Sequence, residues 1–320
     1  MREFTLIASD NKVKEISPGV FYNVWAFNGT VPGPTIRATE GDIVKINFIN
    51  NGSKPHSLHT HGIHPSEMDG VFEMIPPKGK YTYQFIAQPY GVFPYHCHMS
   101  PLEEHISHGL YGVYIVDPKV PRPPADEMVM VMNGYDTDFD RQNNFYTVNG
   151  IPFYYLNKPI QIEKDMPIRI YLVNMLEFDP INNFHLHANM FNYYPSGTRQ
   201  TPDQYTDIIP QTQGERGILE FNYTYPGKYM FHAHITEFSE KGWMGIFDVK
   251  DNGKNTAITD KIQKNYNSSL ASINNVNYGR TIENNNSNIS IKSQITNTSD
   301  TNYTSAVQQN KSSSNRGNFL

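Results

Sequence analysis

The chain has 320 residues, 38% of them hydrophobic, which is enough for one large core or two modest ones. A membrane helix needs about 18 consecutive apolar residues, and no such run occurs, so the sequence excludes a helical membrane span. The formal net charge of −5 argues against a nucleic-acid partner. Cys97 is the only cysteine, so its thiol cannot form a disulfide within the chain and is packed, reactive or a metal ligand.

Short stretches of alternating polarity recur between turns rich in glycine and proline, a pattern typical of strands. They include residues 44–48, 111–116 and 168–172. Turn signals such as Pro32-Gly33-Pro34 and Tyr225-Pro226-Gly227 arrive at the spacing of β-sandwiches. No segment has a sustained apolar period of 3.6 residues. The predicted fold class is therefore all-β.

The division of the chain is indicated by changes in composition. Residues 119–126 are rich in proline and predict a stiff linker, because proline cannot pair inside a sheet and favours extended backbone. We therefore expect one sandwich over residues 1–118 and a second over 127–250. Asparagine, serine and threonine dominate residues 251–320, which predicts a disordered tail. Because Phe4 to Ala8 already resembles a strand, we expect no export signal within this sequence.

All 12 histidines fall in short windows of the sequence. These windows are residues 56–64, 96–108, 185–187 and 232–234. Histidines that merely pack in a core would be scattered. Neutral imidazoles are the commonest protein ligands for copper and zinc, so this clustering indicates a metal site.

The spacing within the windows sharpens the prediction, because side chains two apart on a strand face the same side. Four pairs of imidazoles therefore converge: His59 with His61, His96 with His98, His185 with His187, and His232 with His234. Cys97 and His56 fall by parity on the opposite side, where His105 from a downstream loop can join them. Two histidines with one cysteine are the ligand set of blue copper. The eight-imidazole set lacks thiolate and carboxylate and fits copper better than zinc, calcium or magnesium.

Across residues 1 to about 250 the sequence resembles the multicopper oxidases. The motifs that carry the resemblance are His56-x-x-His59-x-His61, His96-Cys97-His98 followed by His105 and Gly109-Leu110, His185-x-His187, and His232-x-His234. The resemblance implies two cupredoxin-like Greek-key domains. It further implies a type 1 copper that takes single electrons from a reductant, and a trinuclear copper cluster where dioxygen becomes water.

The resemblance also implies a role for each ligand. The type 1 residues would be His56, Cys97 and His105, with Leu110 in the axial position and not coordinating. The type 2 copper would be held by His59 and His185, and the type 3 pair by His61, His96, His98, His187, His232 and His234. This makes about four copper ions per chain. His108 as the type 1 ligand and Met99 as the axial ligand stay open as alternatives.

The second half repeats the first with its thiolate site erased. Asn182, Ala233, Phe238 and Trp243 stand where the type 1 residues of the first half stand, which indicates an internal duplication. Each half supplies four of the eight cluster histidines, so the cluster must lie between a first and a second domain. The resemblance implies that these belong to neighbouring subunits of a head-to-tail homotrimer.

Oxygen reduction consumes protons, so a carboxyl group near the cluster should relay them. Glu104, beside His105, and Asp69, after the first histidine window, are the candidates, although a surface loop or a turn explains each equally well. His64 and His108 are left over, either with roles beside the ligands or substrate or simply exposed.

The predicted function is a laccase-like, two-domain multicopper oxidase that couples oxidation of a reductant to reduction of dioxygen to water. A copper nitrite reductase is the alternative, because the interval from Cys97 to His105 is closer to that of those enzymes. They carry Asp at the place of His59 and lack a second histidine after the cysteine, whereas His98 is present here. A non-catalytic copper protein that carries electrons is a third possibility.

The electron donor stays open between a phenol, a hydroxylamine-like nitrogen compound, cuprous ion and a small blue-copper protein. Copper enzymes of this kind usually work outside the cytoplasm. We therefore expect a periplasmic, cell-surface or secreted protein.

Overall fold

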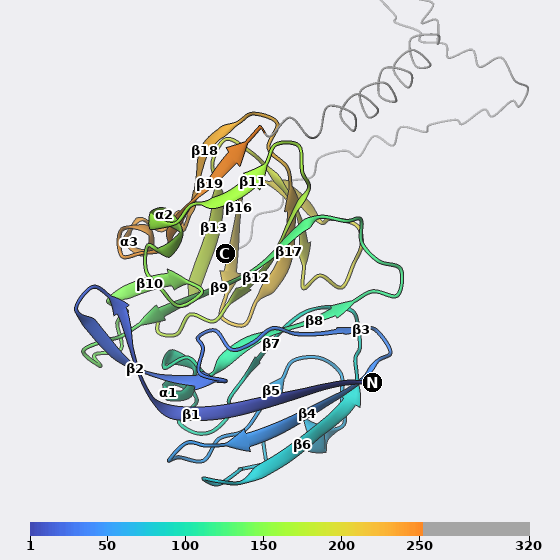
Figure 1. Cartoon of the computed structure of the whole chain (residues 1–320), viewed down its shortest axis with the longest axis vertical. Coiled ribbons are helices and arrows are strands. Elements are labelled where there is room, and N and C mark those ends of the chain that lie inside the picture. The colour runs from blue at the N-terminus through green and yellow to red at the C-terminus, as the bar shows by residue number, and fades with distance from the viewer. Residues whose placement is uncertain (252–320) are drawn as a thin grey trace, which may run out of the picture. The chain divides into compact units, whose positions relative to one another are not determined.

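The computed structural model of the chain describes residues 1–251, and contacts group them in one compact unit. They fold mainly as strands (Figure 1), which confirms the all-β prediction. The three strands predicted at 44–48, 111–116 and 168–172 are all present. The tail predicted at 251–320 lies outside the described residues from position 252 on.

The N-terminal half forms two four-stranded sheets. The first has the order β2-β1-β4-β6 and contains β1 (Arg2–Ser17), β2 (Val20–Phe27), β4 (Ile43–Asn50) and β6 (Lys80–Ile86). The second has the order β3-β8-β7-β5 and contains β3 (Ile36–Thr39), β5 (His59–Thr60), β7 (Gly91–His96) and β8 (Tyr111–Asp117). Inward-facing residues such as Phe48, Tyr83 and Tyr95 fill the core between them.

Two short helices interrupt this half: η1 (Ser66–Met68) follows the first histidine window, and α1 (Leu102–Ser107) joins β7 to β8. His105 lies in α1, so its prediction as a loop residue is wrong. Leucine and glutamate at the start of α1 are good helix formers. At six residues, however, the helix is too short to show a 3.6-residue apolar period.

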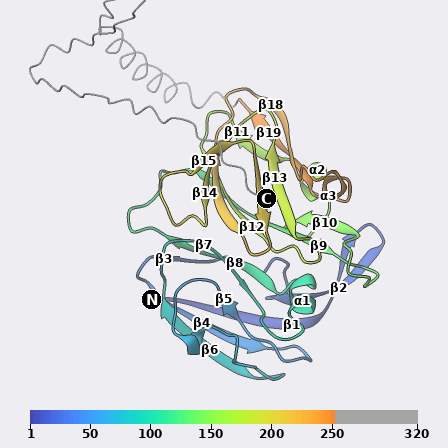
Figure 2. The same ribbon diagram turned by 180° about the vertical axis from the view of Figure 1, so that it is seen from behind.

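The C-terminal half forms a six-stranded and a five-stranded sheet. The six-stranded sheet has the order β10-β9-β12-β17-β14-β15 and contains β9 (Asp126–Tyr135), β10 (Phe145–Val148), β12 (Ile168–Asn174), β14 (Phe191–Pro195), β15 (Gln204–Thr206) and β17 (Arg216–Phe221). The five-stranded sheet has the order β11-β19-β18-β13-β16 and contains β11 (Ile160–Glu163), β13 (Ile181–Leu186), β16 (Ile208–Thr212), β18 (Gly227–His232) and β19 (Met244–Lys250). Its helices are α2 (Tyr154–Asn157) and α3 (Thr236–Glu240). Figure 2 shows this half from behind, with β14 and β15 at one edge.

The two halves share a plan. In the first, His59 pairs with His96 across β5 and β7, and α1 follows β7. In the second, His185 pairs with His232 across β13 and β18, and α3 follows β18. This equivalence supports the internal duplication inferred from the sequence.

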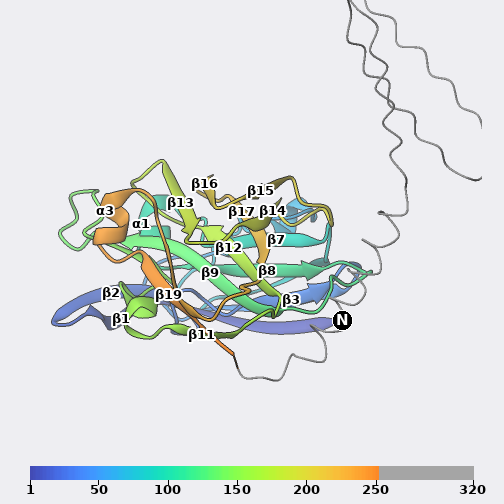
Figure 3. The ribbon, with the colours of Figure 1, turned by 90° about the horizontal axis from the view of Figure 1, so that it is seen from above.

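Contacts join the halves where β7 faces β17 (Figure 3). The guanidinium Nε of Arg216 donates a 3.1 Å hydrogen bond to the peptide oxygen of Val92. A buried cluster includes Val92 and Val113 from the first half and Tyr171 and Ile218 from the second. Residues 119–125 run between β8 and β9 without a strand or helix. The exact division at residues 118 and 127 stays a prediction.

Candidate metal centre

One group of possible metal ligands surrounds the cysteine. Cys97 directly follows β7 and is buried, as are His56 and His105. The Cys97 Sγ lies 3.1 Å from Nδ1 of His105 and 3.8 Å from Nδ1 of His56, and the two Nδ1 atoms are 3.3 Å apart. Two imidazole nitrogens and one sulfur at these separations suit a single metal ion with blue-copper ligands.

Burial shifts the pKa values of all three side chains. It lowers the pKa of His105 to about 4 and also lowers the pKa of His56, so both rings are neutral at pH 7. Burial raises the pKa of the Cys97 thiol to about 11. A metal ion that binds here must therefore displace the thiol proton. The amide of Ser57 donates to Cys97 Sγ at 3.4 Å and would also stabilise a thiolate.

The rival ligand His108 is bonded away from the cysteine, whereas the predicted axial residue Leu110 and its rival Met99 share the hydrophobic core that contains Cys97. His108 donates from Nδ1 to the peptide oxygen of Glu104 at 2.8 Å, and its ring packs 4.6 Å from the ring of Trp25. Leu110 is buried, and its peptide oxygen accepts a 3.0 Å hydrogen bond from the amide of Cys97. Met99 is only partly buried and packs against the same core as Leu110 and Cys97.

A second group gathers the imidazoles of the first half on the other side of β7. His59, His61 and His96 place their donor nitrogens within 4.8 Å of one another, with Nε2 of His61 3.3 Å from Nε2 of His96. The ring of His98 lies 5.3 Å from that of His59 at an angle of 72°. All four histidines that parity assigned to this side lie together.

A third group repeats this arrangement in the second half. His185, His187 and His232 place their donor nitrogens within 4.8 Å of one another, with 2.8 Å between Nε2 of His187 and Nε2 of His232. The rings of His185 and His234 are 5.2 Å apart at 71°. Spacing and angle reproduce those of His59 and His98, so the two sets of four are equivalent half-sites.

Backbone oxygens orient these rings. Nδ1 donates to a peptide oxygen in four of them: His59 to Asp69 at 2.8 Å, His96 to Cys97 at 2.9 Å, His185 to Asp207 at 2.9 Å and His232 to Ala233 at 2.6 Å. Each such bond places the ring proton on Nδ1 and leaves the Nε2 lone pair for a metal. Burial also lowers the pKa of His61 to about 3 and that of His96 to about 4, which keeps both rings neutral.

The two half-sites stay apart within one chain. Among residues 1–251, no group of ligand atoms within 4.8 Å combines histidines from both halves. His187 and His234 are exposed, and His59, His61 and His98 are only partly buried. Two incomplete sets of imidazoles therefore reach the surface of the described chain.

Family comparisons agree with this geometry. The sequence matches two family models, both described as multicopper oxidase, at residues 11–121 and 121–253. The chain belongs to the multicopper oxidase family. A solved structure described as a multicopper oxidase is 54% identical, with a TM-score of 0.77, and covers 78% of this chain and 89% of its own.

Copper nitrite reductases also resemble this family member. The solved copper nitrite reductase from Nitrosomonas europaea is 29% identical with a TM-score of 0.71, over 78% of this chain and 94% of that one. The copper-containing nitrite reductase of Neisseria meningitidis is 27% identical over 78% of this chain and 70% of that protein. The chain therefore belongs to a family of copper-containing oxidoreductases, and it resembles both multicopper oxidases and copper nitrite reductases.

The two carboxylates singled out in the sequence lie in different places in this multicopper oxidase. The Asp69 Oδ1 atom is 3.1 Å from Nδ1 of His59 and 3.7 Å from Nε2 of His64, beside the first half-site. Glu104 lies instead beside the thiolate group, the name used for the site formed by His56, Cys97 and His105. There its carboxylate pairs with the ammonium of Lys54 at 2.7 Å. Nε2 of His64 also donates a 2.6 Å hydrogen bond to the peptide oxygen of Thr60.

Two further carboxylates near the histidines, Asp207 and Asp10, were not predicted from the sequence. The Asp207 Oδ2 atom lies 3.8 Å from Nδ1 of His185 and is the counterpart of Asp69 in the second half. Asp10 lies 3.4 Å from Nε2 of His56. Asp10 is 46 residues from His56 in the sequence and Asp207 is 22 residues from His185, so no local spacing marks either contact.

The erased site of the second half is packed with hydrophobic side chains. Asn182, Ala233, Phe238 and Trp243 are all buried. The Phe238 ring stacks on that of Tyr146 with 3.9 Å between centroids. These contacts agree with the prediction that packing has replaced metal binding there.

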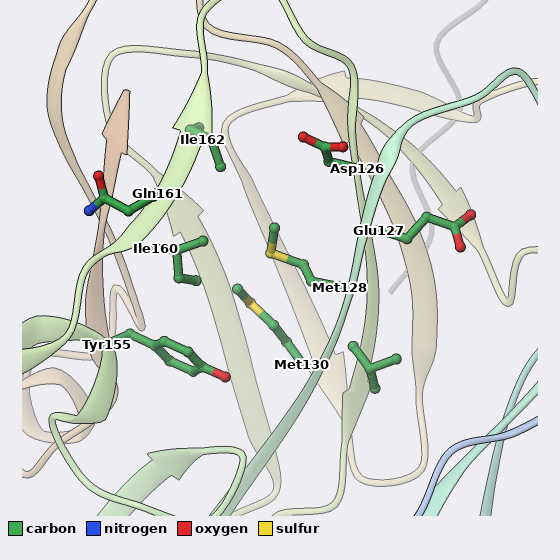
Figure 4. A pocket seen from close by; sticks show the side chains of 9 residues that line it. Asp126, Glu127, Met128, Met130, Tyr155, Ile160, Gln161 and Ile162 are labelled. Atoms are coloured by element: carbon green, nitrogen blue, oxygen red, sulfur yellow. The ribbon is translucent and has the colours of Figure 1, made fainter. Parts of the chain in front are cut away.

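A separate cavity of 420 Å³ lies between β9 and β11. Figure 4 shows Met128, Met130, Ile160 and Tyr155 around it, with both methionine side chains extending into the space between the two strands. The cavity contains no histidine, unlike the three groups above. Separately, none of the helices in residues 1–251 is long and apolar enough to cross a membrane.

Proposed function

We propose that the chain is an oxygen-reducing multicopper oxidase, laccase-like in the broad sense. The thiolate group of His56, Cys97 and His105 would hold a type 1 copper, and the two half-sites would together hold a type 2 copper and a type 3 pair, about four copper ions per chain. When bound, copper would supply one-electron oxidation of a donor and the reduction of dioxygen to water.

The observation that carries the proposal is the equivalence of the two half-sites. The rings of His59 and His61 lie 5.0 Å apart at 56°, and those of His185 and His187 lie 4.9 Å apart at 57°. His96 and His98 are 6.0 Å apart at 27°, and His232 and His234 are 6.0 Å apart at 26°. Eight imidazoles in two matching fours supply more ligands than a mononuclear copper needs, whereas three copper ions use them all.

We further propose that the cluster assembles between subunits. Each chain holds both half-sites but keeps them apart. The first half of one copy would therefore contact the second half of another. A heterologous contact of this kind closes into a ring, and we expect the ring to be a homotrimer. The partly exposed histidines are then buried at each junction.

The carboxylates beside His59 and His185 fit proton delivery. Asp69 lies near the type 2 position of the first half-site, and Asp207 near that of the second. Each can hold a proton close to the place where oxygen would be reduced, while the imidazole Nδ1 stays bound to a peptide oxygen. Glu104 lies in α1 next to His105 of the thiolate group and not beside either half-site. We therefore assign the proton relay to Asp69 and Asp207.

Nitrite reduction is the second candidate. The long segment from Cys97 to His105, which ends inside α1, and the resemblance to copper nitrite reductases favour it. The placement of His59 and His98 in one half-site favours the oxidase.

Oxygen uptake with a phenolic or ferrous donor, measured beside nitric oxide formation from nitrite, tests the proposal. The oxidase consumes oxygen and binds about four copper ions per chain, and the reductase makes nitric oxide and binds about two. His98→Asn should stop oxygen uptake while the donor still bleaches the blue centre, and His64→Gln serves as the matched control. Copper-loaded protein that makes nitric oxide but takes up no oxygen with any donor would refute the oxidase. Location outside the cytoplasm stays a prediction, to be checked by cell fractionation.

A further inference from the structure

A buried carboxylate stands behind one ligand of the thiolate group. The ring of His56 is fully buried and directs Nδ1 toward Cys97 and His105. Its other nitrogen, Nε2, lies 3.4 Å from Oδ2 of Asp10 in β1. Within residues 1–251, Nε2 makes no hydrogen bond of good geometry, so this contact with the carboxylate is what faces its proton. The Asp10 side chain is 2% exposed, so water does not replace this contact.

The carboxylate is held in place by the segment that leads to His56. Its Oδ2 accepts hydrogen bonds from the amide of Ser53 at 2.7 Å, the amide of Lys54 at 2.9 Å and the hydroxyl of Ser53 at 3.1 Å. A Cβ atom on Gly52 would lie 2.7 Å from Nε2 of His56 and 2.8 Å from Oδ2 of Asp10. Glycine at this position is therefore what allows carboxylate and imidazole to approach each other.

The same segment reaches the second imidazole ligand. The Lys54 ammonium pairs with Glu104 at 2.7 Å and lies 4.6 Å from the centre of the Trp25 ring. The Trp25 ring in turn meets that of His105 edge to face at 4.9 Å. Asp10 thus anchors a chain of contacts that runs from β1 to the helix carrying His105.

We propose that Asp10 is a positioning residue that holds the ring proton of His56 on Nε2 and lowers the reduction potential of the type 1 copper. The inference rests on the proposed type 1 centre and deepens it. A neutral imidazole carries one proton, so a ring that binds metal through Nδ1 must carry that proton on Nε2. A carboxylate that accepts this proton makes the ring a stronger donor to the metal. The added negative charge stabilises Cu(II) relative to Cu(I).

This effect opposes that of Leu110. An axial position without a ligand atom weakens the binding of Cu(II) and raises the potential. Asp10 pushes the potential the other way, through the ring of His56. The potential of this centre is then set by a balance between a buried leucine and a buried carboxylate.

Asp10→Asn in the full copper-loaded chain tests the proposal, because it keeps the shape and removes the charge. We expect the type 1 potential to rise in a redox titration and the affinity for Cu(II) to fall by roughly 10- to 100-fold in a competition assay. Asp42→Asn is the matched control, since Asp42 also accepts a backbone amide, from Thr39, but lies away from the ligands. A purely structural role would alter stability and leave the potential unchanged. An unchanged or lower potential in Asp10→Asn overturns the proposal.

Nitrogen NMR of the wild-type apo-protein gives a second measurement. It requires no bound copper and does not depend on whether a variant folds. The ¹⁵N signals of His56 should show the proton on Nε2, and a proton on Nδ1 would contradict the proposal. Both readouts are independent of oxygen or nitrite turnover. A chain that binds no blue copper refutes the proposed function, whereas a normal blue centre insensitive to Asp10 refutes only this inference.

Discussion

The peptide oxygen of Cys97 accepts a 2.9 Å hydrogen bond from Nδ1 of His96. The residue that would bind type 1 copper is therefore joined to a cluster imidazole by one peptide bond and one hydrogen bond. Ala233 and His232 keep the same bond in the second half, at 2.6 Å, although no thiol is present. In both halves this bond leaves the Nε2 lone pair free for a metal, and in the first half it would also connect the proposed type 1 copper to the proposed cluster.

Replacing the thiol tests the type 1 assignment. We expect Cys97→Ser to lose the intense visible absorption of a copper–thiolate bond and about one copper ion per chain, because the two remaining imidazoles bind copper more weakly. The cluster metals should stay, since their ligands lie on the other side of β7. Absorption and metal analysis check this, and blue colour that survives the change would refute the assignment.

Mixing two defective copies tests assembly between subunits. His98→Ala damages the first half-site and His187→Ala the second, so neither variant alone should take up oxygen. In a mixed trimer about one junction in three pairs an intact first half-site with an intact second one. Averaged over all trimers from equal mixing this is about one junction in four, which should restore that share of the activity. If each cluster formed within one chain, co-expression would restore nothing.

Acid should destabilise the apo-protein through its buried imidazoles. Burial lowers the pKa of His105 and His96 to about 4 and that of His61 to about 3, whereas an unfolded histidine titrates near 6.5. Above pH 6.5 these histidines are neutral in both the folded and the unfolded protein, and the free energy of unfolding is at its full value. As the pH falls from 6.5 toward 4, only the unfolded state takes up these protons, so stability falls.

Urea unfolding of the apo-protein between pH 7.5 and 4.5 measures this loss. His96→Gln removes one such group and should reduce the slope by up to about 1.4 kcal/mol per pH unit. His64→Gln is a control for the loss of a histidine outside the groups of candidate copper ligands. A stability that stays flat across this range in the wild-type protein would contradict the prediction.

A methyl group on Gly52 should disturb the thiolate group. Its Cβ would meet buried atoms of His56 and Asp10 below 3.0 Å, and neither can move freely. We expect Gly52→Ala to cost roughly 1–3 kcal/mol of stability and to weaken copper binding. Gly19→Ala is the comparison, because its φ of +76° makes alanine unfavourable but no atom lies within 4 Å of the added carbon. Equal copper affinity in both variants would argue against the close approach.

Much of the candidate site follows from local rules. On a strand, side chains alternate between faces, so the positions of Cys97 between His96 and His98 place thiol and imidazoles on opposite sides before any tertiary contact is known. The short turn of α1 escaped this reasoning because its six residues carry no periodic signal. His105 nevertheless reaches the thiol, since only residues 97–101 separate the helix from β7.

The sequence by itself determined the all-β fold and predicted the duplication and the two kinds of ligand set, because strand alternation and motif spacing act over a few residues. Only the tertiary structure decided that Asp10 lies behind His56, that Asp207 matches Asp69, and that the two half-sites of one chain stay apart. These relationships join strands distant in the sequence, and they depend on how sheets pack rather than on any local pattern of residues.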